Sequence, residues 1–212
     1  MNRLPPPYQP LFFESQPQPV IVLEGVSGIG KSTLADLLAR RLKASSFHTL
    51  PEPHTGWSST INAHLRSLPQ FAFYLSGVLH ASDRLRHART LGPVVADRYV
   101  SSVIACHAAV HHVPVDTVAN LLEPFRPYLV TPTLTVYLRC SEESLCERMA
   151  AKQDVKSDDT DLLEVPGRLS RLLANFAHVA ERDKTAVWLD TDGKTPEELA
   201  DRILADLEHT LA

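Results

Sequence analysis

The chain has 212 residues, of which 44% are hydrophobic and 22% are charged, as expected for an ordinary globular domain. Its 21 lysines and arginines against 25 acidic residues give a formal net charge of −4, which argues against an extended surface for nucleic acid or an anionic membrane. The three cysteines lack metal-ligand spacing, and neither a signal peptide nor a bilayer-spanning apolar run is evident. We therefore expect reduced thiols and a cytoplasmic protein.

Residues 1–19 differ from the rest of the chain. They hold six of the sixteen prolines and show no hydrophobic periodicity. We interpret them as a proline-rich arm, which is either a plain tail or a segment that Phe12 and Phe13 attach to the body or to a partner. The folded domain is then expected over residues 20–212.

From Val20 onward, short apolar runs alternate with helical patterns. Strands are expected at residues 20–23, 46–50, 93–96, 133–139 and 186–189. Helices are expected at residues 32–43, about 58–90, 100–112, 115–126, 141–151, 162–182 and from 196 onward. This alternation predicts an α/β fold, a three-layer sandwich in which a five-stranded parallel sheet carries helices on both faces. The polar stretch 152–161 has no pattern and is long enough to form a short lid.

The segment from Gly25 to Ser32, GVSGIGKS, satisfies the phosphate-loop pattern G-x-x-x-x-G-K-[ST], and it lies between the first expected strand and helix. Glycines let the backbone curl closely around phosphate oxygens, and the helix beyond adds the positive end of its dipole. Lys31 is expected to contact the β- and γ-phosphates, and the Ser32 hydroxyl to ligate Mg²⁺. The expected ATP-binding residues are Gly25, Ser27, Gly28, Ile29, Gly30, Lys31, Ser32 and Thr33.

Two further stretches follow strands, and ligands of open α/β sheets bind beyond the carboxyl ends of the strands. Asp97 and Arg98 follow the third strand, where an Asp can hold Mg²⁺ and an Arg can grip the acceptor. Glu52 follows the second strand and is a candidate catalytic base. Trp57 is either core or a wall of the acceptor pocket.

These segments resemble the family that joins thymidylate kinases with deoxynucleoside kinases and herpesvirus-type thymidine kinases. LEGVSGIGKST at 23–33 is similar to both branches, and VVADRYVSS at 94–102 resembles the thymidylate kinase signature, in which the Asp-Arg pair serves the metal and the acceptor phosphate. PEPHTGW at 51–57 instead resembles the E-P-x-x-x-W stretch of the nucleoside kinases. That resemblance makes Glu52 the general base for a sugar 5′-hydroxyl and places Trp57 in the nucleoside pocket.

The resemblance implies a P-loop kinase fold, and commonly a homodimer. FAFY at 71–74 looks like the F-x-F-Q of the nucleoside kinases, which makes Phe73 and Tyr74 candidate substrate residues or, alternatively, helix core. Tyr74 replaces the glutamine that reads the base in those enzymes. Arg148 and Lys152, at the start of the lid, are expected to close over ATP.

We therefore expect ATP-dependent phosphoryl transfer to a nucleoside or a nucleoside monophosphate. A nucleoside acceptor is slightly favoured, because Glu52 supplies a base whereas only Arg98 is securely placed to grip an acceptor phosphate; Arg84 and Arg86 are less securely placed. The alternatives are a thymidylate kinase, a P-loop kinase of a non-nucleoside small molecule, and a nucleotide-binding switch with little turnover.

Overall fold

A single parallel sheet organises the part of the chain that the computed structural model describes, namely residues 9–13, 16–151 and 157–212, with backbone alone for 157–159 and 161. The order of its five strands is β2-β3-β1-β4-β5. The strands are β1 (Val20–Glu24), β2 (Ser45–His48), β3 (Val94–Asp97), β4 (Leu134–Arg139) and β5 (Ala186–Asp190). Each lies within a residue or two of its predicted position, because short apolar runs bounded by turn residues are a strong strand signal.

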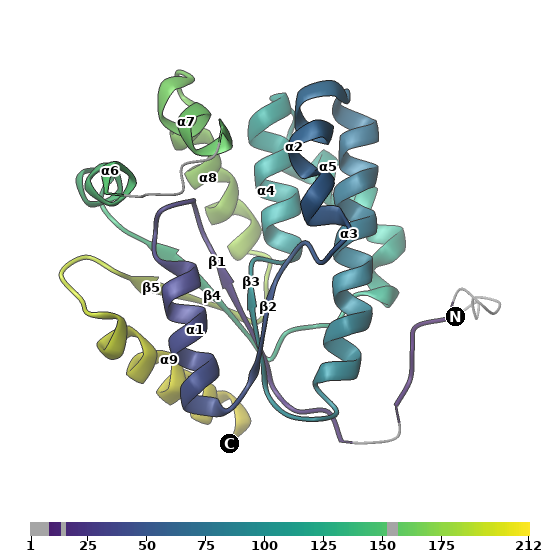
Figure 1. Ribbon diagram of the computed structural model, residues 1–212, viewed down its shortest axis with the longest axis vertical. Coiled ribbons are helices and arrows are strands. Elements are labelled where there is room, and N and C mark those ends of the chain that lie inside the picture. The colour runs from purple at the N-terminus through teal and green to yellow at the C-terminus, as the bar shows by residue number, and fades with distance from the viewer. Residues whose placement is uncertain (1–8, 14–15, 152–156) are drawn as a thin grey trace.

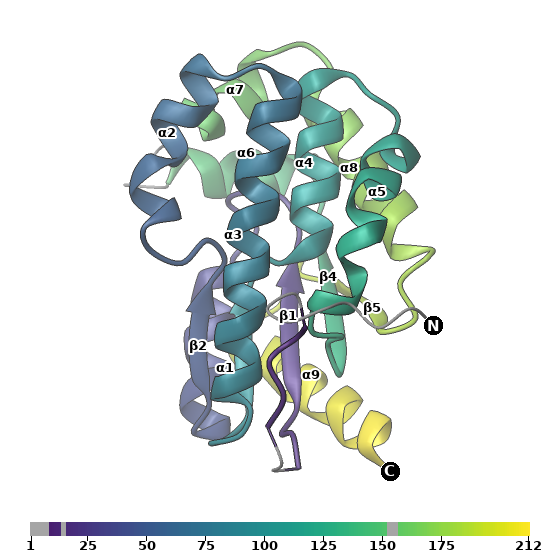
Figure 2. The same cartoon turned by 90° about the vertical axis from the view of Figure 1, so that its right-hand side faces the viewer.

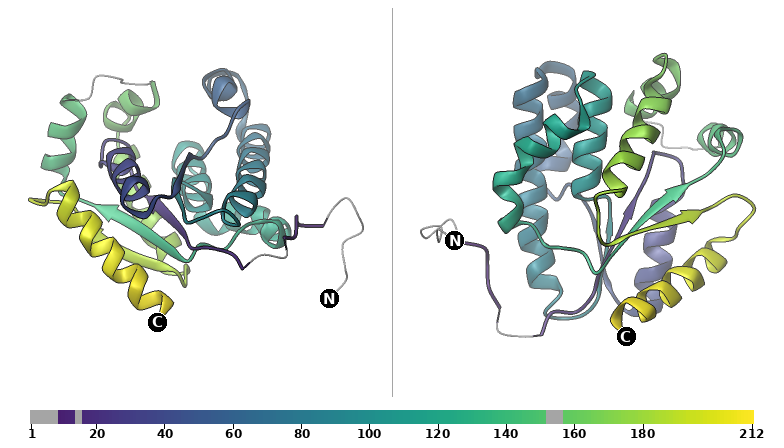
Figure 3. Two further views of the ribbon diagram at one scale, coloured as in Figure 1. Left: turned by 60° about the horizontal axis from the view of Figure 1, so that its bottom comes forward. Right: turned by 180° about the vertical axis from the view of Figure 1, so that it is seen from behind.

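Helices cover both faces of the sheet, as predicted (Figures 1 and 3). One face carries α1 (Lys31–Leu42) and α9 (Pro196–Leu211). The other carries α3 (Ser67–Ala88), α4 (Val100–His111), α5 (Val115–Leu122) and α8 (Arg168–Ala180), with a 3₁₀ turn, η1, at Glu123–Tyr128. Towards the carboxyl ends of the strands lie α2 (His54–His64), α6 (Glu142–Ala150) and α7 (Ser157–Glu164) (Figures 1 and 2).

The central strand β1 is buried along its whole length and supplies both hydrophobic cores. Ile21 and Leu23 pack with α1 and α9, whereas Val20 and Val22 pack with α3, α4 and α5. Successive side chains of a strand point to opposite faces, so a strand covered on both sides must be apolar throughout. This requirement explains the continuous VIVL run.

The strand register brings the ends of three strands to one edge of the sheet. Leu23 of β1 pairs with Asp97 of β3, which pairs in turn with His48 of β2. The loops that follow these strands therefore begin side by side, although they are far apart in the sequence. All the sequence motifs on the acceptor side emerge at this edge.

Several helix boundaries differ from the prediction. The helix expected over 58–90 starts earlier, at His54, and an extended Leu65–Arg66 break divides it into α2 and α3. The helix expected over 162–182 is divided near Gly167, which has a φ of 71°. Residues 157–161 of the predicted patternless lid are helical in α7. Residues 152–156 lie outside the described part of the chain.

The end of the N-terminal arm contacts α3. The Gln18 N–H donates to Arg89 O at 2.8 Å, and Arg89 Nε donates to Gln18 O at 3.1 Å. The boundary between arm and domain stays a prediction. Among the described residues, no helix combines the length and the apolar character needed to cross a membrane.

His107 on α4 is an ionisable side chain inside the α3–α4 contact. Its side chain is 8% exposed, its ring lies 5.5 Å from that of Phe71, and its Nδ1 has no hydrogen-bond partner among the described residues. Burial, with a smaller contribution from the charge of His111, lowers the pKa of His107 to about 4. The fold therefore holds this imidazole neutral.

We predict that His107 makes the fold sensitive to acid. The unfolded chain takes up a proton near the ordinary histidine pKa of about 6.5 and the folded chain only near 4, so stability falls as the pH drops through this window. Urea denaturation should show a free energy of unfolding on the order of 1–3 kcal/mol lower at pH 4 than at pH 7 from this group. His107→Gln should flatten that slope, whereas His209→Gln, at an exposed site on α9, should leave it unchanged. Equal slopes in all three proteins would contradict the assignment.

Candidate active site

The phosphate loop turns sharply between β1 and α1. Gly25, Gly28 and Gly30 have φ values of 141°, 81° and 101°, which side-chain-bearing residues rarely adopt. A Cβ on Gly28 would also collide with the side chain of Met149 on α6, so a larger residue there would require that methionine to move. The other predicted ATP-binding residues lie along the same turn: Ile29 is buried, Ser27 is half-buried, and Ser32 and Thr33 are exposed at the start of α1.

Lys31, at the start of α1, is only 5% exposed. Its Nζ donates to the Val26 carbonyl within the loop at 2.6 Å. Burial, together with the nearby charge of Arg98, lowers the pKa of Lys31 to about 7, although Asp97 and Glu24 act in the opposite direction. The ammonium group thus lacks a full counter-charge, which phosphate oxygens would supply.

Asp97, at the end of β3, is joined to the phosphate loop. The Ser32 hydroxyl donates to Asp97 Oδ2 at 2.6 Å, and His48 Nδ1 lies 3.6 Å from the same oxygen. Burial alone would raise the pKa of Asp97, but the nearby His48 ring, the hydrogen bond from Ser32 and the charges of Lys31 and Arg98 hold it well below its usual value. Asp97 is therefore ionised, and its buried Oδ1 has no hydrogen-bond partner among the described residues.

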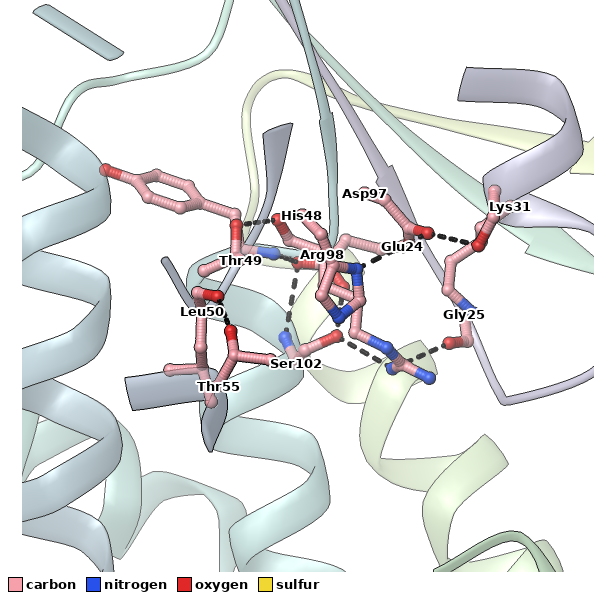
Figure 4. A network of polar contacts seen from close by, with 12 residues as sticks. Glu24, Gly25, Lys31, His48, Thr49, Leu50, Thr55, Asp97, Arg98 and Ser102 are labelled. Atoms are coloured by element: carbon pink, nitrogen blue, oxygen red, sulfur yellow. Dashed lines mark hydrogen bonds and ion pairs between the residues drawn. The ribbon is translucent and has the colours of Figure 1, made fainter. Parts of the chain in front are cut away.

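Arg98 follows directly and is half-buried. Its Nη1 donates to Gly25 O at 3.1 Å and to Ser102 Oγ at 3.2 Å, so the guanidinium lies against the phosphate loop (Figure 4). Its backbone has a φ of 71°. We define the polar network of this site by its members, Glu24, Gly25, Lys31, Ser32, His48, Thr49, Asp97, Arg98 and Ser102.

Arg148 braces the phosphate loop from α6. Its Nη1 donates to Ile29 O at 3.3 Å and to Thr191 Oγ1 at 2.8 Å, and its Nη2 donates to Thr191 O at 3.1 Å. The side chain thus joins the loop to the segment that follows β5. Lys152, predicted beside it, lies outside the described residues.

Glu52 and Trp57, predicted on the acceptor side, are both on the surface. Glu52 is exposed and makes no hydrogen bond or ion pair with the described residues, and Trp57 on α2 is 60% exposed. The alternative that Trp57 is a core residue is therefore wrong. The structure does not join Glu52 to the polar network.

Phe73 and Tyr74 lie on α3 and face α2. The Phe73 ring lies 5.3 Å from that of His54, and the Tyr74 hydroxyl donates to Asn62 Oδ1 at 2.7 Å. Both rings are half-buried. They help to attach α2 to α3, and their predicted contact with a substrate stays a prediction.

Arg84 and Arg86, the less secure candidates for a phosphate clamp, both lie on α3 and have other partners. Arg84 stacks over Phe47, with its guanidinium carbon 5.0 Å from the ring centroid, and Arg86 Nη1 contacts Asp83 Oδ1 at 3.2 Å. Among the described residues, neither bonds to the polar network.

The sequence analysis missed four members of the polar network, namely Glu24, His48, Thr49 and Ser102. Glu24 is fully buried at the end of β1 and accepts hydrogen bonds from the Tyr99 and Ser102 N–H groups. The sequence signal that could have identified Glu24 is a carboxylate directly after the continuous apolar run of β1. The Thr49 hydroxyl donates to Arg98 O at 2.6 Å, and nothing in the local sequence indicates that contact.

Comparisons with known proteins agree with this geometry. The family model described as thymidylate kinase matches residues 23–203. The chain belongs to the thymidylate kinase family. The thymidylate kinase of Rhodopseudomonas palustris is 29% identical over 197 residues, which cover 86% of this chain and 85% of that protein.

Two solved structures share the fold. The thymidylate kinase of Candida albicans superposes with a TM-score of 0.72 at 19% identity and covers 91% of this chain and 92% of its own. The deoxyadenosine kinase of M. mycoides superposes with a TM-score of 0.66 at 19% identity and covers 90% of this chain and 99% of its own. The predicted family and fold are thus confirmed. As a member of the thymidylate kinase family, the protein is a kinase with ATP as phosphate donor and nucleotides as substrates.

We predict that Gly28→Ala disrupts the phosphate loop. The new Cβ meets Met149, and the left-handed backbone alone costs an L-residue roughly 1–2 kcal/mol, so the loop amides must shift. ATP affinity measured by calorimetry should fall by about tenfold or more, the equivalent of ~1.4 kcal/mol. The matched control is Gly92→Ala, since no atom lies within 4 Å of a Cβ built there. Unchanged ATP affinity in Gly28→Ala would show that this loop does not bind the nucleotide.

Proposed function

We propose that the protein transfers the γ-phosphate of ATP to a nucleoside monophosphate, with dTMP as the acceptor. The observation that carries this proposal is the placement of Arg98. Its guanidinium lies against the phosphate loop at Gly25 O, at the edge of the sheet where an acceptor phosphate must approach ATP. Family membership and the thymidylate kinase relatives support the same acceptor.

The nucleoside acceptor, which the sequence slightly favours, has less support. A sugar hydroxyl must lose a proton and needs a base within hydrogen-bond reach, whereas a monophosphate is already an anion and needs positive charge instead. Glu52, the proposed base, is exposed and has no partner among the described residues that would orient it. Arg98 is oriented by two hydrogen bonds.

The chain's own residues would act by positioning and by charge. Lys31 would exchange its bond to Val26 O for β- and γ-phosphate oxygens, and the loop amides would hold the same group. Arg98 would hold the acceptor phosphate near the γ-phosphate, against the repulsion of like charges. Arg148 would keep the loop in shape from α6.

The residues present fit the expected Mg²⁺. Asp97 is ionised and has an unpartnered buried oxygen, and the Ser32 hydroxyl is bonded to its other oxygen. Hard oxygen donors suit Mg²⁺, which commonly takes one or two protein ligands together with substrate phosphates. Bound there, the ion would neutralise charge on the phosphates. The homodimer and the cytoplasmic location stay predictions.

The first test compares acceptors and variants. In an ADP-release assay, dTMP should be the better substrate and thymidine a poor one. Arg98→Ala should raise the KM for dTMP by roughly 10- to 100-fold, the effect of losing a charge-assisted hydrogen bond, with little change in the KM for ATP. Glu52→Gln should stay within about threefold of wild-type turnover, since no proton must be removed from a monophosphate.

The control is Arg202→Ala, because Arg202 is exposed on α9 and pairs with Asp206 one turn further along the same helix. A preference for thymidine, with a hundredfold loss of turnover in Glu52→Gln, would make the protein a nucleoside kinase. If no nucleoside or nucleotide stimulates ADP release by the protein, the acceptor belongs to another class of molecule or the protein is a nucleotide-binding switch.

A second prediction separates activity from stability at Lys31. Lys31→Met should reduce turnover by at least a hundredfold, since losing a transition-state contact of this kind costs about 2.7–4 kcal/mol. Its free energy of unfolding without nucleotide should equal or exceed that of wild type, because burial disfavours the Lys31 charge. Lys194→Met, at an exposed position, is the control. More than a tenth of wild-type turnover in Lys31→Met would refute the assignment.

A further inference from the structure

Arg98 combines two properties that rarely occur together. It has a side chain placed for phosphate chemistry, and its φ of 71° lies in the left-handed region that non-glycine residues disfavour. Such a conformation persists only where the surroundings hold it, and it commonly marks a functional site.

Hydrogen bonds hold the backbone on both sides of Arg98. Its N–H donates to Leu23 O at 2.9 Å, and its carbonyl accepts from Thr49 Oγ1 at 2.6 Å. The next N–H, that of Tyr99, donates to Glu24 Oε1 at 2.9 Å. The peptide planes before and after Arg98 are therefore both fixed, one by a main-chain bond and the other by two side chains.

The same carboxylate also acts on the Arg98 side chain. Ser102 Oγ, which accepts from Arg98 Nη1 at 3.2 Å, donates its own proton to Glu24 Oε2. Glu24 thus fixes the backbone after Arg98 through one oxygen and the guanidinium, by way of Ser102, through the other (Figure 4).

We propose that Glu24 and Thr49 are positioning residues, which hold Arg98 in its left-handed conformation and so preset its guanidinium for the acceptor phosphate. The Glu24 oxygens accept from the Tyr99 N–H and from Ser102, and the Thr49 hydroxyl donates to Arg98 O, so both residues act through Arg98 rather than by touching the acceptor. The inference rests on the proposed function for the role of Arg98. It adds that the Arg98 guanidinium is already in position before the acceptor binds.

Thr49 gives the sharper test, because valine has nearly the same shape and removes only the hydroxyl. Thr49→Val leaves the Arg98 carbonyl without its donor, and the KM for dTMP should rise by about tenfold. The KM for ATP should stay close to wild type, while the melting temperature should fall by a few degrees because the Arg98 carbonyl loses its donor. Thr49→Ser retains the hydroxyl and should restore the KM for dTMP. Thr210→Val, which removes a similar hydroxyl-to-carbonyl bond on α9, should change neither KM.

A double-mutant cycle separates positioning from direct contact. Arg98→Gly loses the guanidinium but adopts the left-handed backbone freely, so in that background Thr49→Val should change the KM for dTMP by less than about twofold. Glu24→Gln should likewise raise the KM for dTMP when Arg98 is present and change it by less than about twofold in the Arg98→Gly background. Equal effects of Thr49→Val with and without Arg98 would mean that Thr49 contacts the acceptor itself, and would overturn the inference.

The cycle also tells this inference apart from the proposed function. If Arg98→Gly raises the KM for dTMP but Thr49→Val in the wild-type background does not, the positioning role is overturned and the proposed function stands. If Arg98→Gly leaves the KM for dTMP unchanged, Arg98 does not bind the acceptor. Both the proposed function and the positioning role are then overturned.

Discussion

The hydrogen bond from the Ser32 hydroxyl to Asp97, at 2.6 Å, joins the start of α1 to the end of β3, 65 residues apart in the sequence. It forms because β1 and β3 are parallel neighbours, with Leu23 and Asp97 in register at their carboxyl ends. The order β2-β3-β1-β4-β5 leaves β1 between β3 and β4, so the phosphate loop emerges between the loops of its two neighbours. The donor side and the acceptor side of the site are thus both attached to one edge of the sheet.

This edge concentrates charge that the protein alone does not balance well. Lys31, Asp97 and Glu24 are all buried, and burial shifts the pKa of each towards the neutral form, although the neighbours of Asp97 outweigh that effect. A site that binds phosphates gains from such an arrangement, because the ligand supplies the missing charge in a poorly hydrated place. The hydrophobic layers on either side of β1 provide the stability that the site lacks.

The sequence predicted the parts of the structure that depend on local pattern. The VIVL run, the glycines of GVSGIGKS and the Asp-Arg pair after the third strand all lie where expected, because strand burial, loop curvature and sheet order follow from residue type and spacing. The left-handed backbone of Arg98 was not predictable, since Leu23, Thr49 and Glu24 hold it from other segments. The early start of α2 was missed for a local reason: the proline and glycine in PEPHTGW favoured a loop.

Helix α2 differs from the other described α-helices because none of its residues is buried. It lies against α3 at the carboxyl edge, and contacts such as that between Asn62 and Tyr74 attach it there (Figure 2). Free energy of folding comes mostly from buried apolar surface, so this helix contributes little of it. Substitutions along α2 can therefore accumulate without loss of the fold. The sequence of this segment can therefore change while the buried phosphate loop and the polar network beside it stay in place.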